Sequence, residues 1–301
     1  MRRPATPAWW VLAACAGLGA CDTLPPGDPP PGGQGAGQTA GIEEWRGRTI
    51  GGEPLLQSTM LHTAIMLTGW DSIEVASQSD ESGTVTARVD FISKSEGAAY
   101  GSAVPVAKDG YFLTAGHCVD GQHPTLVTFE IKAGNYHMVK ADARVIWRGD
   151  GASGEPDLAL IHAPVRVGKV FRLVDFNKLR SREAIAATGW SGISKGRPLS
   201  VSAAGRILAV SEPIGEAPDL VWHAIRHDLP IRPGDSGGPL IDWNGKLVGI
   251  NAGLGLSPLN RLRSLANLER FRDRYAGYRA IAYHPDPSWL ARTIQRDRAR
   301  R

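Results

Sequence analysis

Short runs of apolar residues, bounded by glycine, proline, asparagine or aspartate, recur along the chain from about residue 49 onward. Clear examples are GTVTARVDFIS, YFLTAG, TLVTFEIKAG, DLALIHA, GRILAV, LVWHAI and KLVGINAG. Runs of this length with turn residues at both ends are typical of β-strands, and their spacing favours a β-barrel or a β-sandwich. With 301 residues, 42% of them hydrophobic, the chain is long enough to bury a sizeable core in one or two domains.

The segment PDPSWLARTIQRDRAR predicts a terminal helix that packs on this β-body. Pro287 lies near its start, and Trp289, Leu290 and Ile294 fall on one side. Residues 261–301 contain 11 arginines, no lysine and 4 acidic residues. This basic end is either a solvated helix face or a surface that contacts anionic lipid or an acidic partner.

The first residues read as a targeting signal. MRRPATPA supplies two arginines, and WWVLAACAGLGA is an apolar run too short for a comfortable membrane span. The signal closes with LGAC, which resembles the lipobox of bacterial lipoproteins, where the thiol of the first mature residue takes a diacylglyceryl group. We therefore expect removal of residues 1–20 and acylation of Cys21. LAAC, ending at Cys15, leaves a very short apolar region before the cut, and an ordinary secretory signal cut near Ala20 is the alternative.

Residues 21–48 are expected to form a solvated tether, because the Pro- and Gly-rich stretch after Cys21 has no apolar periodicity. If Cys21 is acylated, Cys118 is left alone in the mature fold and no intramolecular disulfide can form. The predicted location is the cell envelope: secreted across the inner membrane, anchored to the lipid bilayer through Cys21 and facing the periplasm.

Three motifs of the sequence contain candidate catalytic residues. In PGDSGGPL, glycines surround Ser236 and leave backbone N–H groups open to hold an oxyanion if the hydroxyl attacks a carbonyl. A serine nucleophile needs a base, and the base needs an orienting acid. His117 follows an apolar run in the segment YFLTAGHCVD. Asp157 directly precedes a second apolar run in the segment EPDLALIHA. Histidine, aspartate and serine in these settings predict a catalytic triad.

These motifs resemble the chymotrypsin/trypsin clan of serine proteases, and more closely its bacterial HtrA-type branch. GSAVPVAKDGYFLTAGHCVD is similar to that branch's GSGF…DGYILTNAHVV, and LPIRPGDSGGPLIDWNGKLVGIN is similar to its INPGNSGGPLVN…DGEVIGIN. ATGWSG is similar to the TGWG of trypsin-like enzymes. The resemblance covers roughly residues 99–295, with gaps. It implies an all-β fold of two packed six-stranded antiparallel β-barrels, over residues 49–170 and 171–301, with a C-terminal α-helix.

The resemblance also implies a role for each motif residue. Ser236 would be the nucleophile, His117 the general base and then acid, and Asp157 the group that fixes the imidazole tautomer. The N–H groups of Gly234 and Ser236 would form the oxyanion hole. Pro230 falls at the base of the primary substrate pocket, where an acidic residue is missing, so small or medium apolar P1 residues are expected. The other residues assigned to this pocket are Asn251, Ala252 and Gly253.

Departures from the family pattern are informative. Trypsin-like enzymes usually join the cysteine after the catalytic histidine to one sixteen residues upstream, a position that is Ser102 here. Asp235 precedes the nucleophile, as in trypsin-like zymogens, which use it to bind a freshly cut N-terminal ammonium. RGRTIGGEP is a weak match to their IVGG start, with Thr49 in place of isoleucine. Activation by cleavage after Arg48 and constitutive activity both remain open. An insertion is expected between about residues 65 and 98, and no C-terminal PDZ domain is recognisable.

Other kinds of site are weaker candidates. His223 and His227 have a spacing that could hold zinc on a helix, but their flanks predict a strand, which would separate them. The acidic residues of RGDGASGEPD are explained by ordinary turn chemistry without calcium. No nucleotide-binding motif is present. We expect no metal, no cofactor and no nucleic-acid partner.

The sequence therefore predicts a serine endopeptidase of the cell envelope that cleaves polypeptide substrates through an acyl-enzyme intermediate. The alternative is a catalytically silent protease-like binding module or scaffold. An esterase-like hydrolase is a third hypothesis. Gly234 and Gly238 fit its GxSxG spacing around Ser236, but the following sequence reads as a hairpin and not as a helix. The oligomeric state is left open.

Overall fold

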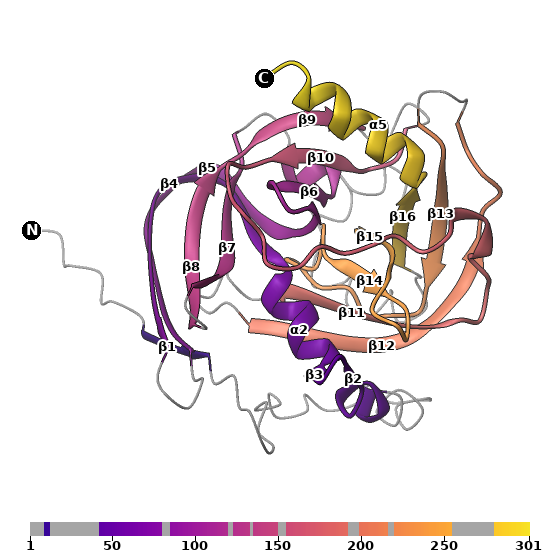
Figure 1. The fold of residues 1–301 in the computed structure, drawn as a ribbon, viewed down its shortest axis with the longest axis horizontal. Helices are drawn as coiled ribbons and strands as arrows, with labels where there is room; N and C mark the ends of the chain where they lie inside the picture. The colour runs from indigo at the N-terminus through magenta and orange to yellow at the C-terminus, as the bar shows by residue number, and fades with distance from the viewer. Residues whose placement is uncertain are drawn as a thin grey trace, which may run out of the picture.

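The fold is built from two antiparallel sheets that lie side by side, with a helix at the C-terminal end (Figure 1). The computed structural model describes residues 9–12, 42–79, 85–119, 123–132, 135–149, 155–191, 199–215, 220–254 and 280–301. Cys21, the expected lipidation site, lies outside the described residues, as do most of the expected signal peptide and tether. No helix among the described residues is long and apolar enough to cross a membrane.

The first sheet is curved and has the strand order β8-β7-β4-β5-β6-β10-β9. Its strands are β4 (Ala64–Ser79), β5 (Val85–Ala107), β6 (Tyr111–Thr114), β7 (Thr125–Lys132), β8 (Asn135–Asp142), β9 (Arg144–Arg148) and β10 (Ala159–His162). The edge strands β8 and β9 are separated by Ala143 alone, so one bent stretch of chain supplies both edges of the sheet. The sheet encloses a core that includes Met66, Phe112, Leu126 and Ile161.

The second sheet is a closed barrel with the order β11-β12-β13-β16-β15-β14. Its strands are β11 (Ala184–Ser191), β12 (Leu199–Val210), β13 (Trp222–His227), β14 (Pro239–Ile241), β15 (Leu247–Leu254) and β16 (Ala280–Pro285). Closure leaves no unpaired edge among the described strands of this barrel. The predicted mostly β architecture is confirmed, with one difference: the second sheet is hydrogen-bonded into a six-stranded barrel, whereas the first is an open curved sheet.

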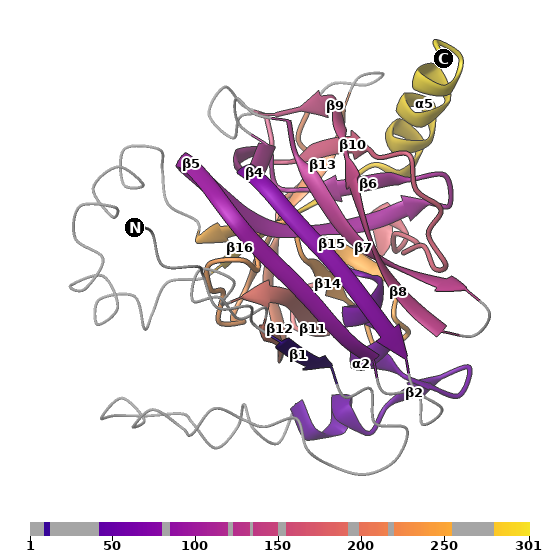
Figure 2. The same ribbon diagram turned by 90° about the vertical axis from the view of Figure 1, so that its left-hand side faces the viewer.

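The segment expected to be an insertion forms a long two-stranded ribbon. Beyond Thr68, β4 and β5 remain paired as far as Ser79 and Val85, with register shifts along the way. Figure 2 shows the two strands running together across the molecule. The short strand β1 (Trp9–Leu12), within the expected signal peptide, pairs with the outer part of β5.

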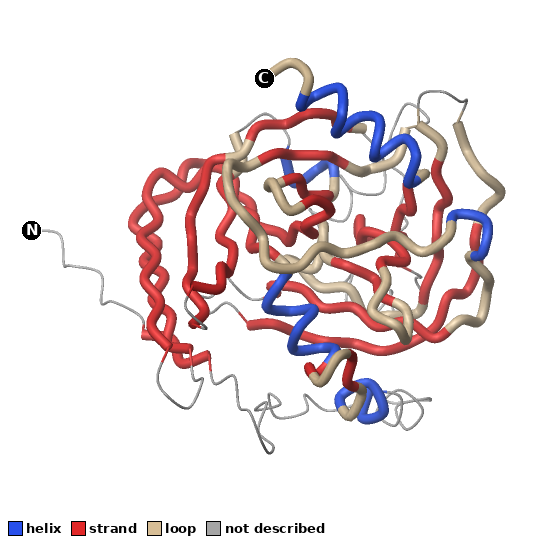
Figure 3. The backbone as a smooth tube through the Cα atoms, viewed as in Figure 1, coloured by secondary structure: helices blue, strands red, loops and turns tan. Residues whose placement is uncertain are grey.

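Helices and loops complete the fold (Figure 3). The strands β2 (Thr49–Ile50) and β3 (Glu53–Pro54) form a small hairpin that leads into α2 (Leu55–His62), and the 3-10 turn η2 (Phe176–Lys178) precedes β11.

The C-terminal helix α5 (Pro287–Arg298) begins after Asp286, whose side chain caps it by accepting a hydrogen bond of 2.9 Å from the Ser288 N–H. Trp289, Leu290 and Ile294, the residues predicted to face the β-body, are buried.

Candidate active site

The three predicted triad residues come from different parts of the two sheets. His117 lies on the 3-10 turn η1 (Gly116–Val119), which follows β6 directly. Asp157 lies just before β10, the strand that pairs with β6. Ser236 lies in the loop between β13 and β14 of the closed barrel. Pairing of β6 with β10 therefore brings the histidine and the aspartate together, while the serine arrives from the second sheet.

His117 and Asp157 form a two-point contact. The His117 N–H donates to Asp157 Oδ1 at 2.7 Å, and the ring Nδ1 lies 2.8 Å from Oδ2. The Asp157 side chain is 3% exposed and that of His117 is 37% exposed, so the carboxylate is shielded while the imidazole reaches solvent. Gly116 permits this approach, because a Cβ there would lie 2.2 Å from the Gly149 carbonyl oxygen and 3.1 Å from Asp157 Oδ1.

This contact controls the protonation of the imidazole. Burial lowers the pKa of His117, but the hydrogen bonds with Asp157 and Cys118 outweigh it and raise the pKa above its ordinary value of 6.5. The carboxylate therefore favours the imidazolium. A base that takes up a proton during a reaction is stabilised by such a partner in its protonated state.

Ser236 is fixed beside the histidine through its backbone. Its carbonyl oxygen accepts a hydrogen bond of 2.8 Å from the Ser102 N–H of β5. Cys118 Sγ lies 4.0 Å from the same oxygen and 3.5 Å from His117 Nε2. Within the described residues, no hydrogen bond joins the His117 ring to the Ser236 hydroxyl. Such contacts often tighten only when substrate binds.

The loop around Ser236 depends on glycines. Gly234 and Gly237 have φ angles of 98° and 81°, a left-handed region that favours glycine. A Cβ at Gly237 would lie 1.9 Å from the Ser102 carbonyl oxygen, so any side chain would push the loop off β5. In the described structure, the N–H groups of Gly234 and Ser236 donate no hydrogen bond within the protein. They remain able to donate to a ligand.

Ser102 is a site residue whose contribution the sequence reasoning missed, because it was noted only as the place of a missing cysteine. Its hydroxyl donates to the Gly234 carbonyl oxygen at 2.8 Å and accepts from the Trp190 N–H at 3.1 Å. The side chain is completely buried. A polar residue within the apolar run of β5 was the available signal. One hydroxyl thus ties the nucleophile loop to both sheets, while Cys118 is a free, buried thiol.

Asp235 already has a partner in the uncut chain. Its Oδ2 accepts a hydrogen bond of 2.8 Å from the Arg232 N–H, and a Cβ at Gly189 would meet its Oδ1 at 2.5 Å. The segment around Arg48, after which activating cleavage would occur, also contacts the body of the protein. Arg48 donates to the Trp243 carbonyl oxygen at 3.2 Å, and its guanidinium lies over the Trp243 ring at 5.1 Å.

The residues assigned to the substrate pocket lie near this loop. Asn251 on β15 pairs with it through the backbone: the Gly237 N–H donates to the Asn251 carbonyl oxygen at 2.7 Å. Asn251 and Ala252 are buried, Gly253 has a φ of 123°, and Pro230 is exposed in the loop after β13. The residues that follow β15, 255–279, lie outside the described part of the chain.

The two histidines considered as zinc ligands are on β13, as their flanks predicted. His223 uses both ring nitrogens on backbone carbonyls, Nδ1 on Ser211 at 2.7 Å and Nε2 on Phe176 at 3.1 Å. His227 is fully buried, and burial lowers its pKa to about 4. Among the described residues, no three His, Cys, Asp or Glu side chains cluster as a metal would require.

The pairing with Asp157 predicts how His117 titrates. We expect its imidazole NMR resonances to titrate with a midpoint above 6.5, and the Asp157→Asn form to titrate at lower pH, because the amide cannot stabilise the imidazolium. The pair should stabilise the fold below pH 6.5, and this contribution should disappear as the pH rises through the raised pKa. Asp142→Asn, on the exposed end of β8, is the matched control; equal midpoints in all three proteins would contradict the analysis.

Comparisons with known proteins identify a peptidase domain in this chain. Residues 101–250 match the family described as "Trypsin-like peptidase domain". The "Serine protease Do-like HtrA" of Bacillus subtilis (strain 168) is 31% identical over 163 residues, which cover 50% of this chain and 33% of the relative. A "Probable periplasmic serine endoprotease DegP-like" of Pseudomonas putida (strain W619) is 30% identical over 162 residues, covering 52% and 29%.

The chain spans about a third of the length of these relatives. Among solved structures, "HtrA-type protease AlgW with decapeptide" aligns with a TM-score of 0.49 and 17% identity, over 80% of this chain and 65% of that chain. The matched residues 101–250 include the motifs that contain His117, Asp157 and Ser236. The family match assigns residues 101–250 to the trypsin-like peptidase domain, and serine proteases of the HtrA and DegP-like type are among the relatives of the chain.

Proposed function

We propose that this protein is a serine endopeptidase in which Ser236, His117 and Asp157 act as the catalytic triad. The observation that carries the proposal is the two-point contact of His117 with buried Asp157, next to a glycine loop that presents Ser236. The trypsin-like peptidase domain over residues 101–250 supports the same chemistry. Its substrates would be polypeptides.

The proposed acylation step begins with a proton transfer from Ser236 to His117. His117 Nε2 accepts the proton of the Ser236 hydroxyl as Oγ attacks the scissile carbonyl carbon. Asp157 accepts a hydrogen bond from Nδ1–H, so that Nε2 is the nitrogen that acts as the base, and the carboxylate then stabilises the imidazolium. The N–H groups of Gly234 and Ser236 hold the oxyanion of the tetrahedral intermediate.

The intermediate collapses when the imidazolium of His117 donates its proton to the leaving amine. The C–N bond breaks, and the acyl group stays on Ser236 Oγ as an ester. A water molecule then attacks this ester while His117 again takes the proton. Hydrolysis regenerates the free Ser236 hydroxyl.

The proposed location is the cell envelope, with the chain anchored through acylated Cys21 and the peptidase facing the periplasm. The LGAC motif after an apolar run supports the anchor. The name of the Pseudomonas putida relative describes that protein as periplasmic, which agrees with an exported chain.

Replacing the nucleophile tests the mechanism. In the full chain, Ser236→Ala should lower kcat by about 10⁶-fold, because it removes the attacking oxygen from a triad that acts as a unit. The measurement is cleavage of a diverse peptide pool followed by mass spectrometry, with unchanged thermal unfolding as the check on folding. Ser181→Ala, an exposed hydroxyl loss elsewhere, should keep full activity. Unchanged turnover in purified Ser236→Ala protein would refute the proposal.

A silent binding module remains the second candidate, since the structure shows no hydrogen bond between His117 and Ser236 within its described residues. A fluorophosphonate probe separates the two, because it reacts with an activated serine. Labelling of the natural chain that is lost in both Ser236→Ala and His117→Gln supports the hydrolase. Absence of labelling with no peptide cleavage supports the binding module.

The pocket residues generate a prediction about specificity. Pro230 offers no carboxylate to a buried arginine or lysine of the substrate, so such a side chain would lose its solvation without gaining an ion pair. We expect cleavage after small or medium apolar residues. Cleavage sites in the same peptide pool report this preference directly. Predominant cleavage after arginine or lysine would show that another residue forms the base of the pocket.

We further propose that the uncut chain is active, because Asp235 already accepts a hydrogen bond from Arg232 and does not wait for a new terminal ammonium. An Arg48→Gln chain, which trypsin-like cleavage cannot open there, should stay in the membrane fraction and hydrolyse peptides at the natural rate. Arg46→Gln, two residues earlier, is the matched control. An inert Arg48→Gln protein beside an active protein beginning at Thr49 would establish the zymogen mechanism instead.

A further inference from the structure

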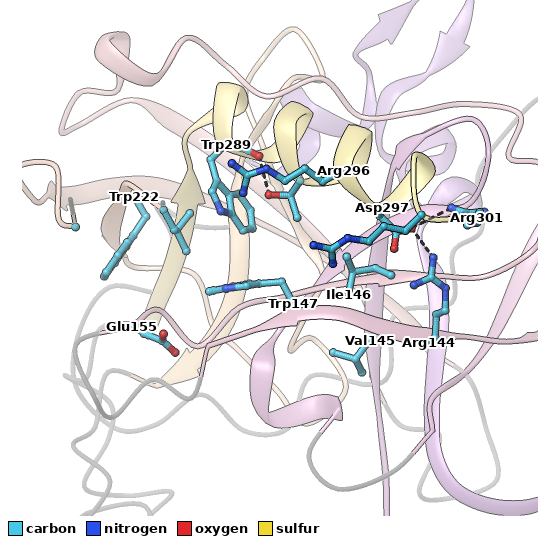
Figure 4. A pocket seen from close by; sticks show the side chains of 14 residues that line it. Arg144, Val145, Ile146, Trp147, Glu155, Trp222, Trp289, Arg296, Asp297 and Arg301 are labelled. Atoms are coloured by element: carbon cyan, nitrogen blue, oxygen red, sulfur yellow. Dashed lines mark hydrogen bonds and ion pairs between the residues drawn. The ribbon is translucent and has the colours of Figure 1, made fainter. Parts of the chain in front are cut away.

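A groove outside the proposed active site lies between α5, β9 and the segment that enters β13 (Figure 4). Its volume is about 820 Å³. Figure 4 places Trp222 and Glu155 at one end and Arg144 and Arg301 at the other, with Trp147 and Trp289 between them. The groove therefore has an aromatic end and a basic end.

One long side of the groove is the edge of a strand. Four consecutive residues of β9, Arg144 to Trp147, line it. Successive side chains of a strand point to opposite faces, so consecutive residues border one groove only where it runs along the strand's edge. Among the described strands, β9 pairs only with β10 and ends the first sheet. Such an edge can accept another extended chain by backbone hydrogen bonding.

The apolar part of the groove is unusually open to solvent. In the described part of the chain, the exposed large hydrophobic side chains are Val145 and Ile214, at 39% and 40%. Val145 lines the groove, and Ile214 exchanges two backbone hydrogen bonds with Trp222 at its aromatic end. The rings of Trp147 and Trp289 meet edge to face, with centroids 5.0 Å apart. Exposed Val145 and the two tryptophan rings thus give the groove an apolar surface that a ligand can cover.

The arginines of the groove divide into two kinds. Arg144 and Arg301 both pair with Asp297, which also accepts a hydrogen bond of 2.7 Å from the Tyr111 hydroxyl. By contrast, the side chains of Arg296, on α5, and Arg300, just after the end of α5, make no hydrogen bond or ion pair with any described residue. The groove thus keeps two unpaired positive charges beside an unpaired strand edge.

We propose that this groove docks an extended peptide segment of a partner protein, with acidic side chains at the arginine end and an aromatic or aliphatic side chain at the tryptophan end. The segment would add to β9 as a further strand. Charge decides which end of the groove the acidic side chains occupy, because Glu155 at the aromatic end repels them while the unpaired Arg296 and Arg300 elsewhere in the groove attract them. The proposal does not depend on catalysis.

Binding is measured on the full chain carrying Ser236→Ala, so that no peptide is cut. The probes are two fluorescein-labelled octapeptides, Glu-Asp-Glu-Val-Val-Trp-Val-Leu and the same residues in reverse order, which cover the two strand directions. We expect one of them to raise fluorescence anisotropy saturably, and a version with lysine at the three acidic positions not to bind. A peptide N-methylated at alternate residues should also fail, because it cannot form the strand ladder.

Variants locate the site. Arg296→Gln with Arg300→Gln should weaken binding of the acidic peptide by about tenfold and reduce its salt dependence. Arg166→Gln with Arg226→Gln removes the same charge from exposed positions elsewhere and should leave binding unchanged. Val145→Asp, a surface change in the groove, should abolish binding without altering thermal unfolding.

Three results would overturn the proposal. Equal binding of the acidic and lysine peptides would remove its electrostatic basis, and full binding of the N-methylated peptide would remove strand addition. If neither acidic peptide binds while phosphatidylglycerol vesicles bind in a manner that requires Arg296 and Arg300, the surface is a lipid contact and not a peptide site. Peptide cleavage by the natural chain is scored separately, so failure here leaves the peptidase assignment standing.

Discussion

The hydrogen bonds of Ser102 join the two sheets at the loop that contains Ser236. The backbone of this residue belongs to β5 and donates to Ser236, while its hydroxyl bridges Gly234 and Trp190 of the other sheet. A buried hydroxyl that satisfies two backbone groups costs about 1–3 kcal/mol to remove, because both partners lose their bond where water cannot replace it. The loop's geometry therefore depends on a residue that has no proposed part in the chemistry itself.

This arrangement also explains why the nucleophile loop is made of glycine. β5 lies so close that Gly237 has no space for a Cβ beside the Ser102 carbonyl oxygen. Where the resemblance leads one to expect a disulfide, the chain has a serine on one side and the free thiol of Cys118 on the other. A hydrogen-bonded bridge does not depend on the redox state of the compartment, whereas a disulfide forms only where conditions are oxidising.

Local pattern was enough to predict the β class, the terminal helix and its buried face, because each depends on residues that are close in sequence. It was not enough for contacts that join distant segments. Ser102 looked like a lost cysteine, since a polar residue in an apolar run indicates a buried hydrogen bond but does not identify Gly234, 132 positions away, as its partner. The open edge at β9 was equally hidden, because the bend at Ala143 that creates it depends on the pairing of β7, β8 and β10. The motifs gave the residue types of the site, and the pairing of β6 with β10 is what brings His117 to Asp157.

The arginines at the C-terminal end show how one charged segment serves two purposes. Arg298 donates two hydrogen bonds, of 2.8 and 2.6 Å, to the carboxylate of Asp109. These bonds attach α5 to the loop between β5 and β6. Asp297 strengthens this attachment, because it accepts a hydrogen bond from the Tyr111 hydroxyl and forms ion pairs with Arg144 and Arg301. Arg296, on the same helix, and Arg300, just after its end, line the groove and make no ion pair with any described residue. Under the proposal above, the attachment of α5 leaves these two positive charges available in the groove for an acidic ligand.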